Sequence, residues 1–155
     1  MKTTVTIALI LSVILNITLI YIFVYKGEIT TSTDNRTELQ MSDANRDFVL
    51  LEMRDFLESV QQINEGILNN NPELVIKAAA HSGGAVIAHT PQGLLKSLPI
   101  GFKDLGFATH AIFDEIEANA KQDFDPIKTQ KQLNDLLNNC TACHQSFKIS
   151  TIPLK

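Results

Sequence analysis

Tryptophan is absent from the 155-residue chain, and lysine and arginine never occur in a run. The formal net charge is -4, whereas a nucleic-acid-binding surface is normally basic. The chain also lacks an internal repeat and any pattern of paired carboxylates or of a nucleophile with its base. We therefore expect neither a nucleic-acid-binding protein nor an enzyme.

Charged residues are also missing from Val5–Tyr25, an almost unbroken apolar run. A helix of that length rises about 1.5 Å per residue and spans roughly 30 Å, the thickness of the bilayer core. The alternative is a cleaved signal peptide, whose apolar region covers about 7–15 residues and ends at a small-x-small site. Here aromatic residues followed by Lys26 end the run, as at a membrane interface. The sequence favours a retained transmembrane anchor over residues 1–26.

The remaining chain divides by composition into three parts. Residues 27–41 are polar and rich in threonine and serine, and they are interpreted as a flexible tether. Residues 42–150 carry the apolar periodicity of a globular domain, and residues 151–155 form a tail. No stretch sustains a period-two alternation, so no strand is expected.

Helical signals recur four times in the globular domain. The first helix is expected over residues 42–70, capped by Ser42 or Asp43. Its apolar residues recur at steps of four and three, which indicates a bundle-type seam. The seam residues are Val49, Met53, Phe56, Val60, Ile63 and Ile67. The third helix is expected over residues 101–122.

Asparagine or aspartate followed by proline marks the start of the second and fourth helices, at Asn71 and Asp125. The second segment, Pro72–His89, contains Gly83 and Gly84, which indicate a kink or a close approach to the backbone. Four helices joined by short links predict an all-α fold, an antiparallel four-helix bundle behind one transmembrane helix.

Cysteine is scarce, and both copies lie in the stretch CTACHQSFK near the C-terminus. Cys140, Cys143 and His144 spell C-x-x-C-H, the attachment signature of c-type haem. On a helix these three side chains share one face, because they are three and four residues apart. Two thioethers can then hold one porphyrin edge while His144 binds the iron as proximal ligand. The sequence predicts one haem c per chain.

Other fates of the cysteine pair fit less well. A redox dithiol is expected at a helix N-terminus, where the helix dipole lowers a thiol pKa, but this pair lies near a C-terminus. A structural zinc site requires four ligands, and no second C-x-x-C or H-x-x-H pair occurs. A disulfide across three helical positions has poor geometry. A thiol–disulfide module is kept only as a third interpretation.

The motif on the last of four helices resembles the ending of the cytochrome c′, or class II c-type cytochrome, family. The family pattern is C-x-x-C-H-x-x-[Phe/Tyr]-[Arg/Lys], matched by Cys140, Cys143, His144, Phe147 and Lys148. Only eleven residues follow His144, so upstream helices must build the haem pocket. The resemblance implies a distal face that is vacant, crowded by an apolar side chain, or filled by a methionine from the first helix. Family members are commonly soluble and periplasmic, so the anchor departs from the pattern.

The residue opposite His144 decides the function. Met53 lies on the first seam and is the candidate distal ligand, with core filler as the alternative. Leu50 and Phe56, about one turn to either side of Met53, are the apolar side chains that could crowd the distal face. Met41 lies at the end of the tether and is a second methionine candidate after Met53. Three other histidines could serve as the sixth iron ligand if their helix faces turn inward. They are His81, His89 and His110.

Charged residues have two candidate roles. Haem propionates could pair with Arg46, Lys96 or Lys103, although solvated surface charge is the commoner role. Acidic groups could form solvated faces or steer a basic redox partner. They are Asp55, Glu58, Asp114, Glu115 and Glu117.

Covalent c-type haem is assembled outside the bacterial cytoplasmic membrane, so we expect a single-pass protein with its haem domain facing the periplasm. The predicted function is a membrane-anchored monohaem c-type cytochrome that passes single electrons to or from periplasmic or membrane redox proteins. The alternative is a five-coordinate haem protein that binds NO or CO for protection or sensing. Class II bundles often form dimers, so a homodimer is a further expectation from the resemblance.

Overall fold

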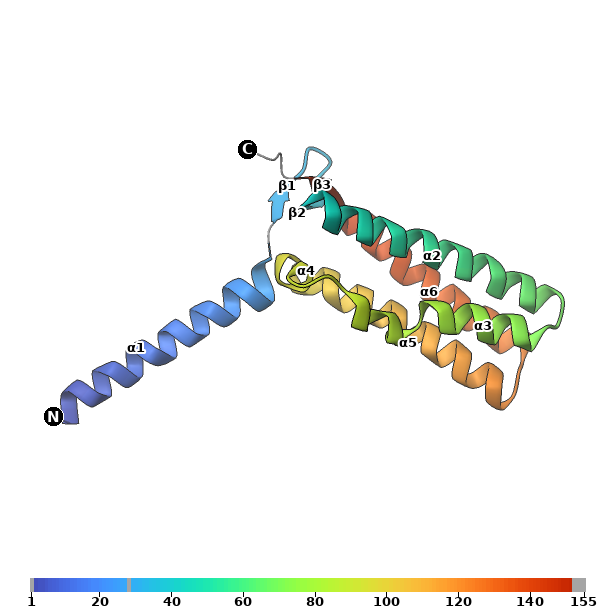
Figure 1. The fold of residues 1–155 in the computed structure, drawn as a ribbon, viewed down its shortest axis with the longest axis horizontal. Coiled ribbons are helices and arrows are strands. Elements are labelled where there is room, and N and C mark those ends of the chain that lie inside the picture. Colours follow the sequence, from blue (N-terminus) through green and yellow to red (C-terminus); the bar gives the residue numbers. More distant parts are fainter. Residues whose placement is uncertain (1, 28, 152–155) are drawn as a thin grey trace.

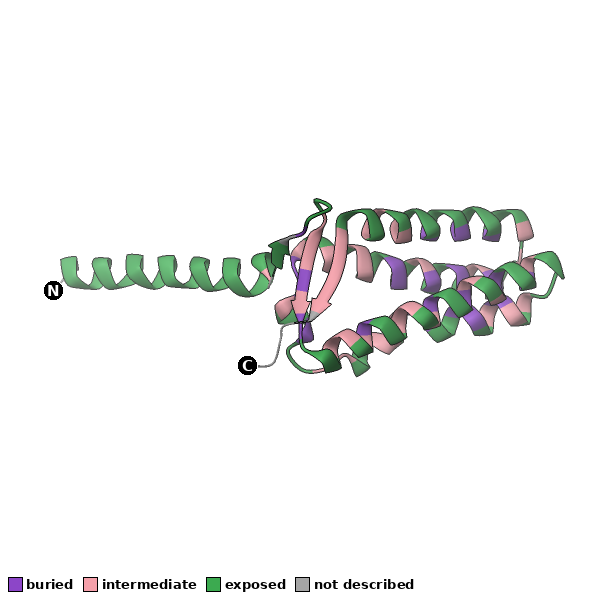
Figure 2. Cartoon of the chain, turned by 90° about the horizontal axis from the view of Figure 1, so that it is seen from above, coloured by how far each residue is buried: buried purple, intermediate pink, exposed green. Residues whose placement is uncertain are grey.

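The computed structural model describes residues 2–27 and 29–151, and most of them are helical, as the sequence predicts. Helix α1 (Lys2–Ile20) continues into the π-helical segment η1 (Tyr21–Lys26) and projects away from the other helices (Figure 1). Figure 2 shows this helix exposed along its length. Within the described residues it is the one helix whose length and composition allow it to cross a membrane, a property that signal sequences share.

Four long helices lie beside one another in the rest of the chain (Figure 1). They are α2 (Asp43–Leu68), α3 (Pro72–Ser82), α5 (Ile100–Gln122) and α6 (Pro126–Ser146). Helices α2 and α5 each pack against both α3 and α6. The main core lies between the four helices and includes the fully buried Ile63, Val75, Phe113 and Leu136.

Local capping explains where three of these helices begin. The side chains of Ser42, Asn71 and Asp125 each accept a backbone N–H from the first turn, at distances between 2.8 and 3.3 Å. Each contact satisfies an N–H that has no partner within the helix. The predicted starts at these three residues are confirmed.

The apolar seam predicted for the first helix is confirmed on α2. Val49, Phe56 and Ile63 are buried, and the alternate seam positions Met53 and Val60 are half-buried. The face therefore turns toward α3 and α6, which both pack on α2. This arrangement places Met53 on an inward-facing position.

The second helical segment is shorter than expected, because α3 ends at Ser82. The 3-10 segment η2 (Gly84–His89) and the short helix α4 (Leu94–Ser97) then lead to α5. The Gly84 N–H donates to both carboxylate oxygens of Asp114 on α5, at 3.0 and 3.1 Å. A Cβ on Gly83 would overlap this carboxylate, so the group approaching the glycine pair is Asp114. The sequence predicted Asp114 on a solvated face or in steering a redox partner, and gave no sign of this contact.

Gly83→Ala is expected to lower the free energy of unfolding by about 1–2 kcal/mol, because the new methyl group must displace Asp114 from the Gly84 N–H. Urea unfolding of the full chain in detergent, followed by circular dichroism, measures the change. Gly101→Ala is the matched control, because a Cβ there meets only Phe147 at an ordinary 3.6 Å. Equal midpoints for the two variants would contradict the role assigned to Asp114.

A small three-stranded sheet covers one end of the helices, so the expectation of no strand is wrong. Its strands, in spatial order, are β1 (Ile29–Thr31), β2 (Thr37–Met41) and β3 (Phe147–Thr151). Strands β1 and β2 form an antiparallel hairpin within residues 27–41, which were expected to be an unstructured tether. Strand β2 pairs in parallel with β3, with Thr37 opposite Phe147.

The strands were missed because the alternation of buried and half-exposed residues in β2 is too short to stand out in the sequence. Leu39 and Met41 are buried while the residues between and beside them are half-exposed, but this pattern covers only five residues. Its partner β3 begins at Phe147, directly after α6 ends at Ser146. Residue 151 closes β3, and the rest of the predicted tail, residues 152–155, lies outside the described residues.

The sheet and the end of η1 pack on the same end of the helices. Leu39 and Met41 join Leu94 and Leu98 in a second apolar cluster. The Lys103 Nζ donates to the backbone oxygen of Val24 at 2.7 Å. The C-terminal end of the apolar N-terminal helix is thus in contact with the start of α5.

Candidate functional site

An apolar cavity of about 470 Å³ lies between α2, α5 and α6. Its volume falls within the roughly 300–1,000 Å³ typical of ligand pockets. Apolar side chains from all three helices form most of the wall, including Leu50, Met53, Phe56, Val60, Leu105 and Leu137. The cavity can therefore enclose a mainly apolar group of moderate size.

Cys140, Cys143 and His144 all line this one cavity. They lie in the last two turns of α6, where the i, i+3 and i+4 spacing brings their side chains to one face. Both cysteines are free thiols and half-buried, and His144 is exposed. The structure therefore brings together the three residues that the motif predicted as a set.

Open space lies beside the backbone of α5 in the cavity wall. Gly106 lies within α5 and lines the cavity, and a Cβ added there would meet no atom within 4 Å. Glycine inside a helix lowers helix stability by about 1 kcal/mol relative to alanine. Helix formation alone therefore does not explain a glycine at this position. The two thiols and the imidazole on α6 could hold a covalent haem, with an apolar wall on α2 and open space beside α5.

The two thiols are poorly suited to disulfide exchange. Burial raises the pKa of Cys140, and burial together with the neighbouring Cys140 raises the pKa of Cys143 to about 11. Both groups are thus protonated at neutral pH, whereas reactive cysteines have lowered pKa values. These shifts argue against the thiol–disulfide interpretation.

A metal ion held by side chains alone is not supported either. Within residues 2–27 and 29–151, no three His, Cys, Asp or Glu side chains group closely enough to bind one. A structural zinc site would require four such ligands. Haem iron needs only one or two protein ligands, because the porphyrin supplies the others.

The candidate distal residues fall into two groups. Met53, Leu50 and Phe56 all line the cavity, and Met53 is half-buried and packs against both apolar clusters. Met41 is buried in the cluster beneath the sheet and is not part of the cavity wall. Ligation of iron by Met53 stays a prediction.

The three remaining histidines also separate. His110 is buried and lines the cavity, whereas His81 and His89 are exposed and lie outside its wall. The His110 Nδ1 is 2.8 Å from the backbone oxygen of Ser82, which can only accept, so Nδ1 carries the proton. The His110 Nε2 lies 3.8 Å from a carboxylate oxygen of Glu52, whose pKa is raised by burial.

The basic residues proposed as propionate partners lie elsewhere. Arg46 pairs with acidic neighbours on its own helix, Lys103 bonds to the backbone near η1, and Lys96 is also absent from the cavity wall. Arg54 does line the cavity, and the sequence interpretation missed it. Its position four residues after Leu50, on the same side of the helix, was the available signal.

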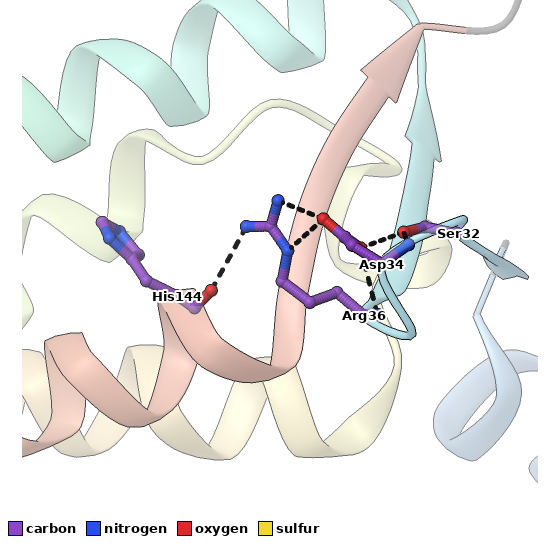
Figure 3. A network of polar contacts seen from close by, with 4 residues as sticks. All are labelled: Ser32, Asp34, Arg36 and His144. Carbon is purple, nitrogen blue, oxygen red and sulfur yellow. Dashed lines mark hydrogen bonds and ion pairs between the residues drawn. The ribbon is translucent and has the colours of Figure 1, made fainter.

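A second missed residue contacts the backbone of His144 (Figure 3). Arg36, in the turn between β1 and β2, donates from Nη1 to the His144 backbone oxygen at 3.3 Å. Its Nε and Nη2 donate to one carboxylate oxygen of Asp34, at 2.9 and 2.7 Å. Arg36 and the Ser32 hydroxyl hold the pKa of Asp34 well below its usual range. No local signal reveals a contact across 108 residues.

Comparisons of the chain with protein-family models, with curated proteins and with solved structures found no match. Interpretation of the site therefore depends on its residues and their geometry. The class II resemblance stays a prediction carried by the terminal motif.

Proposed function

We propose that this chain is a membrane-anchored monohaem c-type cytochrome of the class II type, which carries single electrons on the periplasmic side of a bacterial cytoplasmic membrane. One observation carries the proposal: Cys140, Cys143 and His144 line a single apolar cavity between α2, α5 and α6. In this proposal the four packed helices α2, α3, α5 and α6 form an antiparallel four-helix bundle.

Each motif residue has a separate role in the proposal. Cys140 and Cys143 would hold the haem by thioether bonds from neighbouring turns of α6, and His144 would be the proximal ligand. The bound haem supplies a one-electron couple. The apolar side chains from α2 and α5 would shield part of the haem from water, which would favour the less charged ferrous form and raise the reduction potential.

The apolar N-terminal helix supports the proposed location. Its span Thr3–Lys26 is long enough for a bilayer, and a retained anchor would hold the haem domain at the membrane surface. The N-terminus then lies in the cytoplasm, because c-type haem is attached on the outer side. Membrane or periplasmic redox proteins are the proposed partners, and the net charge of -4 favours basic ones.

The apolar side chains beside Met53 favour a second candidate function. Leu50 and Phe56 line the cavity on the same helix, about one turn to either side. A distal site bounded by such side chains would leave the iron five-coordinate and open to NO or CO. The two functions differ in whether the Met53 thioether binds the iron.

An optical spectrum of the full chain tests both candidates. The chain is produced with and without the c-type maturation machinery and purified in detergent. We expect haem that stays attached under denaturing conditions, in a low-spin form whose reduced spectrum CO does not change. A high-spin spectrum that shifts with CO would select gas binding, and a haem-free chain from cells with the machinery would contradict both candidates.

A further inference from the structure

The last turn of α6 ends without a loop, because Phe147 is already the first residue of β3. The final carbonyls of a helix have no partner within it and must be satisfied from elsewhere. The Phe147 N–H donates to the Cys143 oxygen, and the His144 oxygen accepts from Arg36. The backbone of the proposed iron ligand is thus held by a side chain from the hairpin.

Several contacts fix Arg36 in this position. The parallel register sets Thr37 opposite Phe147, so the preceding residue necessarily lies beside the end of α6. Two bonds to Asp34 orient the guanidinium plane. The turn is closed by backbone bonds between Ser32, Asn35 and Arg36, with Asn35 in the left-handed region at φ 64°.

The charge of Arg36 also matters for an iron bound to His144. A guanidinium is always protonated, and a cation is favourable at a helix C-terminus. Asp34 offsets part of this charge, and the pair is partly exposed, so solvent screens its effect. The remaining positive potential favours the ferrous over the ferric state, because the ferrous iron has one positive charge fewer.

We propose that Arg36 is a positioning residue for His144, which fixes the last turn of α6 and raises the reduction potential of the bound iron. The inference depends on the proposed function for its redox part and on the observed hydrogen bond for its structural part. It gives the hairpin between the apolar helix and the haem domain a role at the site.

The redox part is tested on the haem-loaded full chain in detergent. Arg36→Met is expected to shift the redox equilibrium threefold to tenfold toward the ferric form. A tenfold shift lowers the midpoint potential by about 59 mV for one electron. The iron–histidine vibration should also shift, and Arg36→Lys should retain more of the potential. Lys128→Met removes the same charge from the first turn of α6 and should change neither quantity. An Arg36→Met potential and vibration equal to those of the wild type would overturn the proposal.

The structural part is tested without haem. Amide hydrogen exchange at Phe147 and Lys148 in the haem-free full chain should be about tenfold faster in Arg36→Met and unchanged in Lys128→Met. Equal exchange in all three chains would overturn the role of Arg36. Two results together would contradict the proposed function alone: the wild type attaches no haem, and the Arg36→Met chain exchanges faster than the wild type.

Discussion

Replacing both Cys140 and Cys143 with serine is expected to abolish covalent haem attachment completely. Each serine keeps nearly the shape of cysteine but cannot form a thioether, so the remaining cavity can hold haem only without a covalent bond. Haem should then be extracted by acid–acetone, and the haem stain on a denaturing gel should disappear. Because both cysteines are only half-buried, the helical content should stay that of the wild type.

The single variants and one control sharpen this prediction. Cys140→Ser and Cys143→Ser should each keep one thioether and shift the absorption maximum of the reduced pyridine complex to longer wavelength. The control is Thr141→Ala. Thr141 stands between the two cysteines in the sequence, but it is exposed, and its hydroxyl donates to the Leu137 oxygen of its own helix. That control should attach haem as the wild type does. Covalent haem in the double variant would show that the two sulfurs are not the attachment points.

Local signals in the sequence were sufficient for most helices. Caps at Ser42, Asn71 and Asp125 act within three residues of themselves, so each could be found without knowing the fold. The motif residues were also predictable as a set, because a single helix fixes their spacing. Helical periodicity likewise placed Met53 on an inward face, where the structure has it.

Features that depend on distant segments were not predictable in the same way. Strand β2 is recognisable only together with β3, which is more than a hundred residues later in the chain. The end of α3 depends on Asp114 from another helix, and the hold on His144 depends on Arg36 from the hairpin. In each case the deciding contact joins segments far apart in the sequence, and the local sequence of neither partner reveals it.

Met53→Ala is expected to convert low-spin, six-coordinate iron to a high-spin form that binds CO. Met53 lines the cavity on α2, facing the helix that carries His144, and a thioether there would complete the coordination. Loss of this ligand should also lower the reduction potential, since methionine ligation raises it. Absorption spectra of the ferric, ferrous and CO-treated forms measure the change.

Two further variants separate ligation from packing. Leu50→Ala opens the same cavity wall one turn earlier and should leave the iron low-spin. His110→Ala removes the other group on the wall that could bind iron. His110 is the weaker candidate, because its Nδ1 bonds to Ser82, its ring packs edge-on against Phe56 at 5.0 Å, and its Nε2 faces Glu52.

The pattern across the three variants identifies the distal side. High-spin iron in Met53→Ala alone assigns the thioether and supports electron transfer. High-spin iron in His110→Ala alone assigns the imidazole and contradicts the Met53 prediction. Because Met53 is half-buried, its truncation should cost about 1–2 kcal/mol of stability, so circular dichroism must first show a folded variant. A wild-type iron that is already high-spin and binds CO would show that Met53 only fills the cavity wall, and the function would then be gas binding.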